Sequence, residues 1–218
     1  MRNHYLEVSP ISEVTAIIMC GGKSLRFGRS KALEILGGKS LIEIVIERLQ
    51  LLTDRLLLVT SQEKLALPAS VKVETTADIY PGKGPLGGIY TGLVASHTFL
   101  NVVVACDMPF LNIELLRYMV KQSAGYDAVV PKLEKGMIEP LHAVYSRNCV
   151  ESIKARLDHN DLRLRSFLDG VKVRYIEREE YKPLDPQLLS FFNINDQGQG
   201  GVPGLLVSDG PGQSIRKQ

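Results

Sequence analysis

Apolar residues along this chain follow two patterns: short continuous runs, and longer segments in which they recur every three or four positions. The continuous runs predict strands buried on both faces, as in a parallel sheet. The periodic segments predict helices with one apolar face. The predicted strands are residues 14–20, 55–60, 71–74, 102–106, 127–130, 140–145 and 171–176. The predicted helices are residues 40–52, 84–96, 111–123, 147–157 and 161–168, with Asn112 as the N-cap of the third.

The alternation of these strands and helices predicts the fold class. We expect an α/β protein with a three-layer, doubly wound, mainly parallel sheet of the Rossmann-like type. The 218 residues correspond to one domain of ordinary size, which we expect to span residues 1–196. Residues 197–218 are rich in Gly, Pro and Gln. This composition is typical of poorly ordered chain, so we expect a flexible tail.

Composition excludes several classes of protein without naming one. The net charge of +2 gives no overall bias toward nucleic acid, so no nucleic-acid partner is expected. No window approaches about 18 uninterrupted apolar residues, and the segment 1–12 lacks a secretion signal, so we expect a cytoplasmic protein without a membrane partner. The odd number of widely spaced cysteines favours reduced thiols over disulfides or a zinc site. These cysteines are Cys20, Cys106 and Cys149.

The segment that follows the first predicted strand is the most informative part of the chain. Gly21 and Gly22 come directly after that strand, and the cations Lys23, Arg26, Arg29 and Lys31 follow them. Glycines there let backbone N–H groups approach a bulky anion, which the cations neutralise. Open α/β sheets bind ligands at that end of their strands. The segment therefore predicts a polyphosphate site for a nucleotide; the alternative is a mobile loop with a solvated basic face.

Two common phosphate-binding motifs do not fit this segment. A P-loop reads Gly-x-x-x-x-Gly-Lys-Ser/Thr. The Gly-Gly-Lys-Ser tetrads at 21–24 and 37–40 fail this pattern because the required first glycine falls on Ile17 and Leu33. The dinucleotide pattern Gly-x-Gly-x-x-Gly also fails, since the next glycine after Gly22 is at position 28. A different type of nucleotide loop is therefore required.

Two acidic residues lie in other informative segments. Asp107 lies directly after the strand 102–106, where it would face the glycine loop. Mg²⁺ is held by one or two carboxylates together with substrate phosphates, so one such Asp is sufficient; the alternative is a cap for the next turn. Asp78 precedes Gly84-Pro-Leu-Gly-Gly, which opens a helix whose N-terminus would face an anion or a base. The alternative for this second segment is a Pro/Gly loop before a close-packed helix.

Residues 21–31, Gly-Gly-Lys-Ser-Leu-Arg-Phe-Gly-Arg-Ser-Lys, resemble the nucleotidyltransferase loop Gly-Gly-x-Ser-x-Arg-Met/Phe-Gly-x-x-Lys. The resemblance is to the molybdenum cofactor guanylyltransferase family, which has Leu-Ala-Gly-Gly where this chain has Met-Cys-Gly-Gly at 19–22. Cytidylyl relatives usually read Leu-Ala-Ala-Gly there. Ser30 departs from the Asp that the family often has before the lysine. The Asp107 and Asp78 segments also resemble family elements.

The resemblance implies roles for individual residues. Arg26 and Lys31 would neutralise the triphosphate, and Asp107 would hold Mg²⁺. These three are the implied catalytic residues. The implied nucleotide-binding residues are Met19, Cys20, Gly21, Gly22, Lys31, Asp78 and Asp107.

Two later segments extend the resemblance toward the acceptor. Residues 139–145, Glu-Pro-Leu-His-Ala-Val-Tyr, are similar to a family strand, and residues 191–195 match the Phe-x-Asn-x-Asn terminus. The implied acceptor-binding residues are Asn193 and Asn195, whose amides suit the donors and acceptors of a pterin. We expect His142 to be a hydrogen-bonded strand histidine rather than a catalytic base. Arg163 and Arg165 resemble a family helix and would either contact phosphate or lie on a solvated face.

The function implied by the resemblance is the transfer of GMP from GTP to molybdopterin, with release of pyrophosphate. GTP and molybdopterin are then the substrates, and a molybdenum cofactor carrier or a target molybdoenzyme would be a protein partner. Two alternatives remain at this point. One is a cytidylyl- or sugar-phosphate nucleotidyltransferase, and the other is a non-catalytic nucleotide-binding adaptor.

Overall fold

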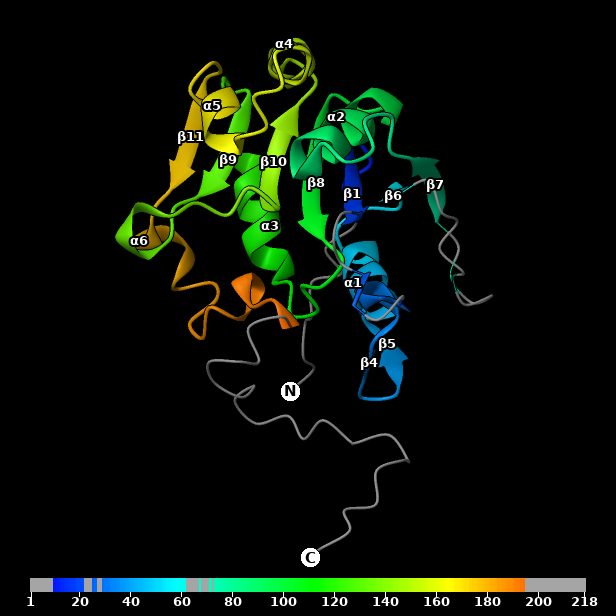
Figure 1. Cartoon of the computed structure of the whole chain (residues 1–218). Coiled ribbons are helices and arrows are strands. Elements are labelled where there is room, and N and C mark those ends of the chain that lie inside the picture. The colour runs from blue at the N-terminus through cyan, green and yellow to red at the C-terminus, as the bar shows by residue number, and fades with distance from the viewer. Residues whose placement is uncertain are drawn as a thin grey trace, which may run out of the picture.

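A seven-stranded sheet runs through the middle of the molecule (Figure 1). The computed structural model describes residues 10–21, 25–26, 29–61, 67, 71 and 73–194. The strands of this sheet are β1 (Val14–Cys20), β6 (Leu56–Thr60), β7 (Glu74–Ala77), β8 (Leu100–Ala105), β9 (Ala128–Pro131), β10 (His142–Ser146) and β11 (Val173–Ile176). Their order is β11-β9-β10-β8-β1-β6-β7, and β10 runs antiparallel to both of its neighbours. The prediction of a mainly parallel sheet is confirmed.

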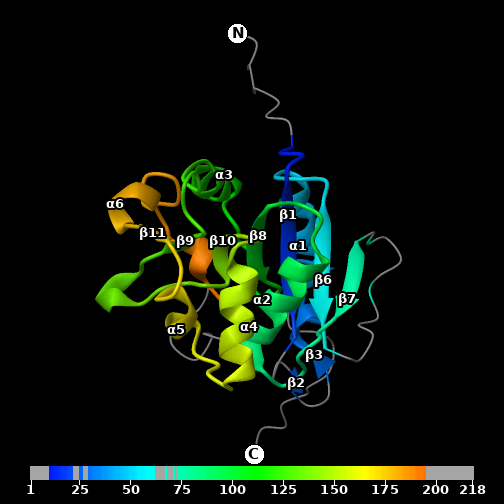
Figure 2. The same ribbon diagram turned by 90° about the horizontal axis from the view of Figure 1, so that it is seen from above.

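Helices cover both faces of the sheet and complete the three predicted layers. Figures 1 and 2 show α2 (Gly84–Ala95), α4 (Cys149–Asp158) and α5 (Leu164–Leu168) on one face, and α1 (Leu41–Gln50) and α3 (Ile113–Lys121) on the other. A hydrophobic core fills the space on each side of the sheet. A short helix, α6 (Arg178–Tyr181), follows β11. Within the described residues, no helix is both long enough and apolar enough to cross a membrane.

The helices begin where their side chains can satisfy the first backbone N–H groups. At α1, the Ser40 hydroxyl accepts from the Glu43 N–H and the Glu43 carboxylate accepts from the Ser40 N–H, which forms a capping box. At α3, the Asn112 side chain accepts from the Leu115 N–H at 3.0 Å. The predicted N-cap at Asn112 is therefore confirmed.

The second Gly-Gly-Lys-Ser tetrad forms a hairpin turn. β4 (Ile35–Leu36) and β5 (Lys39–Ser40) pair antiparallel on either side of Gly37 and Gly38. Both glycines have positive φ values, 60° and 88°, which is the backbone conformation that a two-residue hairpin of this kind requires. These glycines therefore form the hairpin turn, and Ser40, the serine of the tetrad, caps α1.

The predicted third strand, 71–74, is displaced. β7 begins at Glu74, where the prediction ended, and pairs with β6 in the register Leu57↔Glu74 to Thr60↔Ala77. β7 is the last strand at its end of the sheet, and most of its side chains are exposed. Apolar continuity marks strands that are buried on both faces, and an edge strand lacks that signal. The prediction was wrong for this physical reason.

Candidate functional site

The carboxyl ends of four neighbouring strands lie side by side at one end of the sheet, which we call the carboxyl edge. β1 pairs with β8 up to Met19↔Ala105 and with β6 up to Cys20↔Thr60, and β6 pairs with β7 up to Thr60↔Ala77. The residues that follow these strands include Gly21, Asp78 and Asp107, so the fold brings the three predicted segments to this carboxyl edge. In Figure 2, β1 and β6 run toward β2 (Leu25–Arg26) and β3 (Arg29–Ser30), which lie beyond the same edge.

The predicted nucleotide loop is described in part. Cys20 is buried, whereas Gly21 is exposed. β2 and β3 pair antiparallel, with Arg26 opposite Arg29. Lys31 is half-buried and begins the short helix η1 (Lys31–Leu33), whose Ala32 is fully buried in the core on the α1 side. Gly22 lies outside the described residues.

Asp107 lies near a second acidic residue at this edge. Cys106 and Asp107 form the turn after β8, and the Cys106 N–H donates to the Met19 carbonyl at 3.1 Å, which extends the pairing with β1. Burial raises the pKa of Glu139; its bond from the Leu141 N–H opposes that shift, and the charge of Asp107 adds to it. The two half-buried carboxyls are therefore close enough to repel each other.

This pair of carboxyls fits a hard divalent cation. Within the described ranges, no three His, Cys, Asp or Glu side chains form a group that could hold a metal ion. Mg²⁺ does not need such a group, because it is held by one or two carboxylates plus substrate phosphates. A divalent cation would also relieve the repulsion between Asp107 and Glu139. Asp107 and Glu139 are the residues that could hold it.

Two buried thiols lie beside this acidic pair. Cys20 and Cys106 belong to the same hydrophobic core, and all three cysteines are free. Burial raises the pKa of Cys20 well above its ordinary value, and the neighbouring Cys106 and Asp107 raise it further. The Cys20 thiol is therefore neutral and adds no negative charge where phosphates are expected. The prediction of reduced cysteines agrees with this arrangement.

Asp78 follows β7 and is fixed at the start of the next loop. Its N–H donates to the Thr60 carbonyl at 2.8 Å, which continues the pairing between β7 and β6. Its Oδ1 atom accepts from the Tyr80 N–H at 3.0 Å and from the Thr91 hydroxyl at 2.9 Å. The Asp78 side chain is half-buried. The carboxylate is therefore held in one position against α2.

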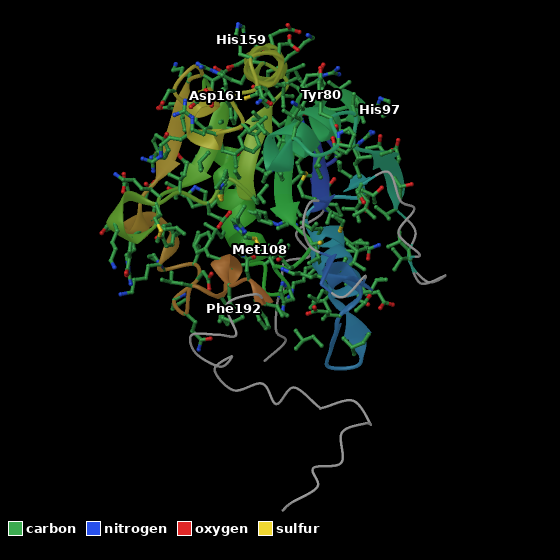
Figure 3. All side chains as sticks on the ribbon, in the orientation of Figure 1. Tyr80, His97, Met108, His159, Asp161 and Phe192 are labelled. Atoms are coloured by element: carbon green, nitrogen blue, oxygen red, sulfur yellow. The ribbon has the colours of Figure 1, made fainter. Side chains whose placement is uncertain are left out.

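The segment 185–194, which we call the C-terminal strap, reaches the carboxyl edge from the face opposite α2. The Ile194 N–H donates to the Asp107 carbonyl at 3.3 Å. Phe192 packs against Phe110 with ring centroids 6.1 Å apart. In Figure 3, Tyr80, His159 and Asp161 lie in the layer of α2 and α4, whereas Met108 and Phe192 lie on the other side of the sheet. The two halves of the predicted site thus come from opposite faces of the sheet.

The strap carries Asn193, the predicted acceptor-binding residue. The Asn193 Oδ1 atom is buried and has no hydrogen-bond partner among the described residues. A buried carbonyl oxygen without a donor is unfavourable by about 1–3 kcal/mol, so a ligand donor would stabilise this position. Asn195 lies outside the described residues.

His142 differs from its prediction. Its side chain is fully buried, and neither ring nitrogen has a hydrogen-bond partner within the part of the chain that the structure describes. Its ring instead contacts Phe191 of the strap edge-on, with ring centroids 5.0 Å apart. Burial lowers the pKa of His142 to about 4. The expected hydrogen-bonded histidine is wrong: the strap packs Phe191 against the ring, and its Asp185 carboxylate is near enough only to oppose part of the lowering of the pKa.

The two arginines that resembled phosphate contacts have protein partners in this structure. The Arg163 Nε atom donates to Asp161 at 2.8 Å, and an Arg165 guanidinium nitrogen donates to the Gly136 carbonyl at 2.7 Å. Both arginines are exposed. Their bonds favour the interpretation as a solvated helix face that joins α5 to its neighbouring loops.

Comparison with known proteins shows which family this chain is similar to. Residues 16–178 match the family model described as the MobA-like NTP transferase domain. The chain is 35% identical over 183 residues to a probable molybdenum cofactor guanylyltransferase of Pelotomaculum thermopropionicum, covering 84% of this chain and 88% of the relative. It is 34% identical over 184 residues to the molybdenum cofactor guanylyltransferase of Desulfosudis oleivorans, covering 84% and 90%.

The chain belongs to the MobA-like NTP transferase family. It is therefore a nucleotidyltransferase. Molybdopterin-guanine dinucleotide biosynthesis protein A from Archaeoglobus fulgidus superposes with a TM-score of 0.72 at 31% identity, covering 83% of this chain and 92% of that one. A cytidylyltransferase from Thermus thermophilus, at 16% identity and a TM-score of 0.61, shares the fold.

Sequence reasoning did not single out two residues of this site. Glu139 was noted as part of a strand motif, but its approach to Asp107 follows from the antiparallel return of β10 beside β8. Thr91 is separated by 13 residues from the Asp78 carboxylate that it contacts. Its place one helical turn after Gly87 is the local signal that could have identified it.

Proposed function

We propose that this protein transfers GMP from GTP to molybdopterin, forming molybdopterin guanine dinucleotide and releasing pyrophosphate. The observation that carries the proposal is the similarity to relatives named molybdenum cofactor guanylyltransferase, which extends over most of both chains. The site supports it, because Gly21, Asp78 and Asp107 meet at one edge of the sheet.

The nucleotide would bind at the carboxyl end of β1. Backbone groups of Met19, Cys20, Gly21 and Gly22 would bind the base and ribose. The Asp78 carboxylate would accept hydrogen bonds from the base or the ribose. Gly21 stands where cytidylyl relatives usually have alanine, which leaves room for a purine. We therefore expect GTP to be the preferred nucleotide.

The phosphates would lie between cations and the acidic pair. Lys31 and Arg26 would neutralise the triphosphate and the departing pyrophosphate. Enzymes of this family typically need a divalent metal; we propose that it is Mg²⁺, held by Asp107 with Glu139 beside it. When bound, Mg²⁺ would stabilise the charge that develops on the phosphates. Phosphoryl-type transfer depends on positioning and on charge stabilisation of this kind.

The acceptor would approach from the side of the C-terminal strap. Asn193 and Asn195 would bind the pterin through their amides, and the unpartnered Asn193 Oδ1 atom is an acceptor that a ligand could use. The attacking phosphate of molybdopterin is already anionic at neutral pH, so no general base is required. The fully buried His142 agrees with a reaction that uses no histidine base. A molybdenum cofactor carrier or a target molybdoenzyme would be the protein partner.

Pyrophosphate release tests this proposal directly. The full-length protein is incubated with Mg²⁺, molybdopterin-loaded carrier and GTP, CTP or ATP in turn. We expect release with GTP at least about tenfold faster than with CTP, the ratio that about 1.4 kcal/mol of differential binding gives. Faster release with CTP would make the protein a cytidylyltransferase. No release with any nucleotide, including in the presence of sugar phosphates, would favour a binding adaptor.

A further inference from the structure

Thr91 joins helix α2 to the loop that carries Asp78. Its side chain is fully buried in the third turn of the helix. Its hydroxyl accepts from the Ile79 N–H at 3.0 Å and lies 2.9 Å from the Asp78 Oδ1 atom. One side chain therefore contacts both the backbone and the carboxylate of the loop.

The loop lies unusually close to the helix at this point. A Cβ atom on Gly87 would lie 2.8 Å from the Tyr80 carbonyl oxygen, a distance that side chains do not tolerate. Gly87 is one helical turn before Thr91, so both residues face the loop. The missing side chain of Gly87 lets the loop approach, and the Thr91 hydroxyl then bonds to it.

The Thr91 hydroxyl hydrogen has two acceptors at the same distance. The Thr91 Oγ1 atom lies 2.9 Å from the Asp78 Oδ1 atom and 2.9 Å from the Gly87 carbonyl oxygen. Hydrogen bonds to an ionised acceptor are about twice as strong as those to a neutral one. The carboxylate is therefore the favoured acceptor, and the hydroxyl holds it against the third turn of α2.

These bonds involve one oxygen of the carboxylate. Oδ1 of Asp78 accepts from both Thr91 and the Tyr80 N–H. Oδ2 of Asp78 accepts from no group in the described part of the chain. The arrangement fixes the orientation of the carboxylate and leaves its second oxygen for a ligand donor.

We propose that Thr91 is a positioning residue for nucleotide binding, which acts by holding the Asp78 carboxylate in its binding orientation. This inference rests on the proposed role of Asp78 in the nucleotide site. A residue with a purely structural role would affect the stability of the fold but not the affinity for GTP. The two roles therefore differ in a measurable way.

The test compares Thr91→Val with a matched control, Thr53→Val. Thr53 is also fully buried; its hydroxyl donates to the Val14 carbonyl at 2.7 Å and accepts from the Arg55 N–H at 3.1 Å, at the opposite edge of the sheet. GTP affinity is measured by calorimetry with Mg²⁺ on the full-length protein, and the free energy of unfolding by denaturant titration. Both variants remove one buried hydroxyl, so both should lose stability.

We expect Thr91→Val to raise the Kd for GTP about tenfold, the loss expected for one weakened charge-assisted contact. Thr91→Ser, which keeps the hydroxyl, should stay within about threefold of the wild type. Thr53→Val should leave the Kd unchanged. An unchanged Kd in Thr91→Val, or an equal rise in Thr53→Val, would overturn the inference.

Asp78→Asn separates this inference from the proposal on which it rests. We expect Asp78→Asn to weaken GTP binding, and Thr91→Val to add little in that background, because the two residues act as one unit. If Asp78→Asn weakens binding but the Thr91→Val loss is fully additive, only the positioning role fails. If Asp78→Asn leaves the Kd for GTP unchanged, the nucleotide-binding role of Asp78 fails and the positioning role with it.

Discussion

Polar groups at the amino edge of the sheet, where β1, β6, β8 and β9 begin, differ in their hydrogen bonding from those at the carboxyl edge. At the amino edge, buried threonines bond to one another or to the backbone: the Thr98 hydroxyl donates to Thr15 at 2.8 Å, and the Thr53 hydroxyl donates to Val14. Asp127, a half-buried acid before β9, accepts at both oxygens, from the Asn148 amide and from the Lys172 N–H. These groups are satisfied within the protein. The buried Ser146 hydroxyl, opposite Leu100 at the same edge, is an exception, because it has no partner among the described residues.

At the carboxyl edge, polar groups are satisfied only in part. Asp78 uses one carboxylate oxygen for protein donors. The charge of Asp107 contributes to the raised pKa of Glu139. The Asn193 Oδ1 atom has no partner among the described residues. The acid at the amino edge, Asp127, is bonded at both oxygens, and the group left without a partner in the described part of that edge, Ser146, is a neutral hydroxyl. The groups with unmet capacity at the carboxyl edge are a carboxylate and an amide, which indicates that ligands complete that edge.

Hollow space by itself does not mark a ligand site at the amino edge. Cavities of about 430 Å³ and 500 Å³ lie at the amino edge, bordered among others by Thr15 and Thr98. These two side chains are already bonded to each other. These cavities therefore carry no evidence of a ligand site.

Removal of a cation from the carboxyl edge should have the largest effect on activity. We expect Lys31→Ala to lower kcat by about 10²–10³-fold, the loss seen when one preorganised charge is removed from a transition state. The measurement is pyrophosphate release at saturating GTP. Lys39→Ala is the control, since Lys39 forms an exposed ion pair with Glu47. Turnover of Lys31→Ala within about threefold of the wild type would contradict the role.

Equivalent substitutions of one acid at each edge would test the comparison itself. Asp107→Asn keeps the shape but removes the charge that a hard cation needs, so we expect the Mg²⁺ concentration for half-maximal activity to rise and turnover to fall. Asp127→Asn should lower the free energy of unfolding by about 1 kcal/mol through weakened hydrogen bonds and leave the Mg²⁺ titration unchanged. An unchanged Mg²⁺ titration in Asp107→Asn would make Asp107 a turn cap.

The buried His142 should make the fold sensitive to acid. Its pKa is lowered to about 4 by burial, whereas an unfolded histidine titrates near pH 6.5. Its contribution to stability is therefore complete above about pH 6.5 and is lost as the pH falls toward 4, by on the order of 3 kcal/mol in total. The free energy of unfolding of His142→Leu should fall less over this range. The control is the exposed His159→Gln, and equal slopes for wild type and His142→Leu would contradict the prediction.

The smallest effect is expected at the acceptor side. Asn193→Ala removes an amide whose pairing with the ligand is worth about 1 kcal/mol, so molybdopterin affinity should fall about fivefold while GTP affinity stays level. Separate binding titrations with each substrate measure both values. Loss of GTP binding with pterin binding retained would mean that the two substrates are placed the wrong way round.

The order and type of the main elements could be predicted because they depend on local patterns. Residues 14–20 form β1 in the structure as predicted, and Asn112 caps α3. The edge strand β7 was misplaced because its exposed side chains carry no apolar signal. The sequence could place Asp107 at a strand end, and parallel pairing brings such ends together. It could not place Asp78 there, because the strand before Asp78 was misplaced.

The sequence alone determined the nucleotide loop, the alternation of strands and helices and the family resemblance, because these depend on residues that are near neighbours along the chain. Only the tertiary structure decided that His142 is buried against Phe191, that Glu139 lies near Asp107, and that Thr91 bonds to Asp78. Each of these contacts joins segments that approach only when sheet and helices pack. Burial and hydrogen-bond satisfaction are properties of that packing, so local patterns alone do not determine them.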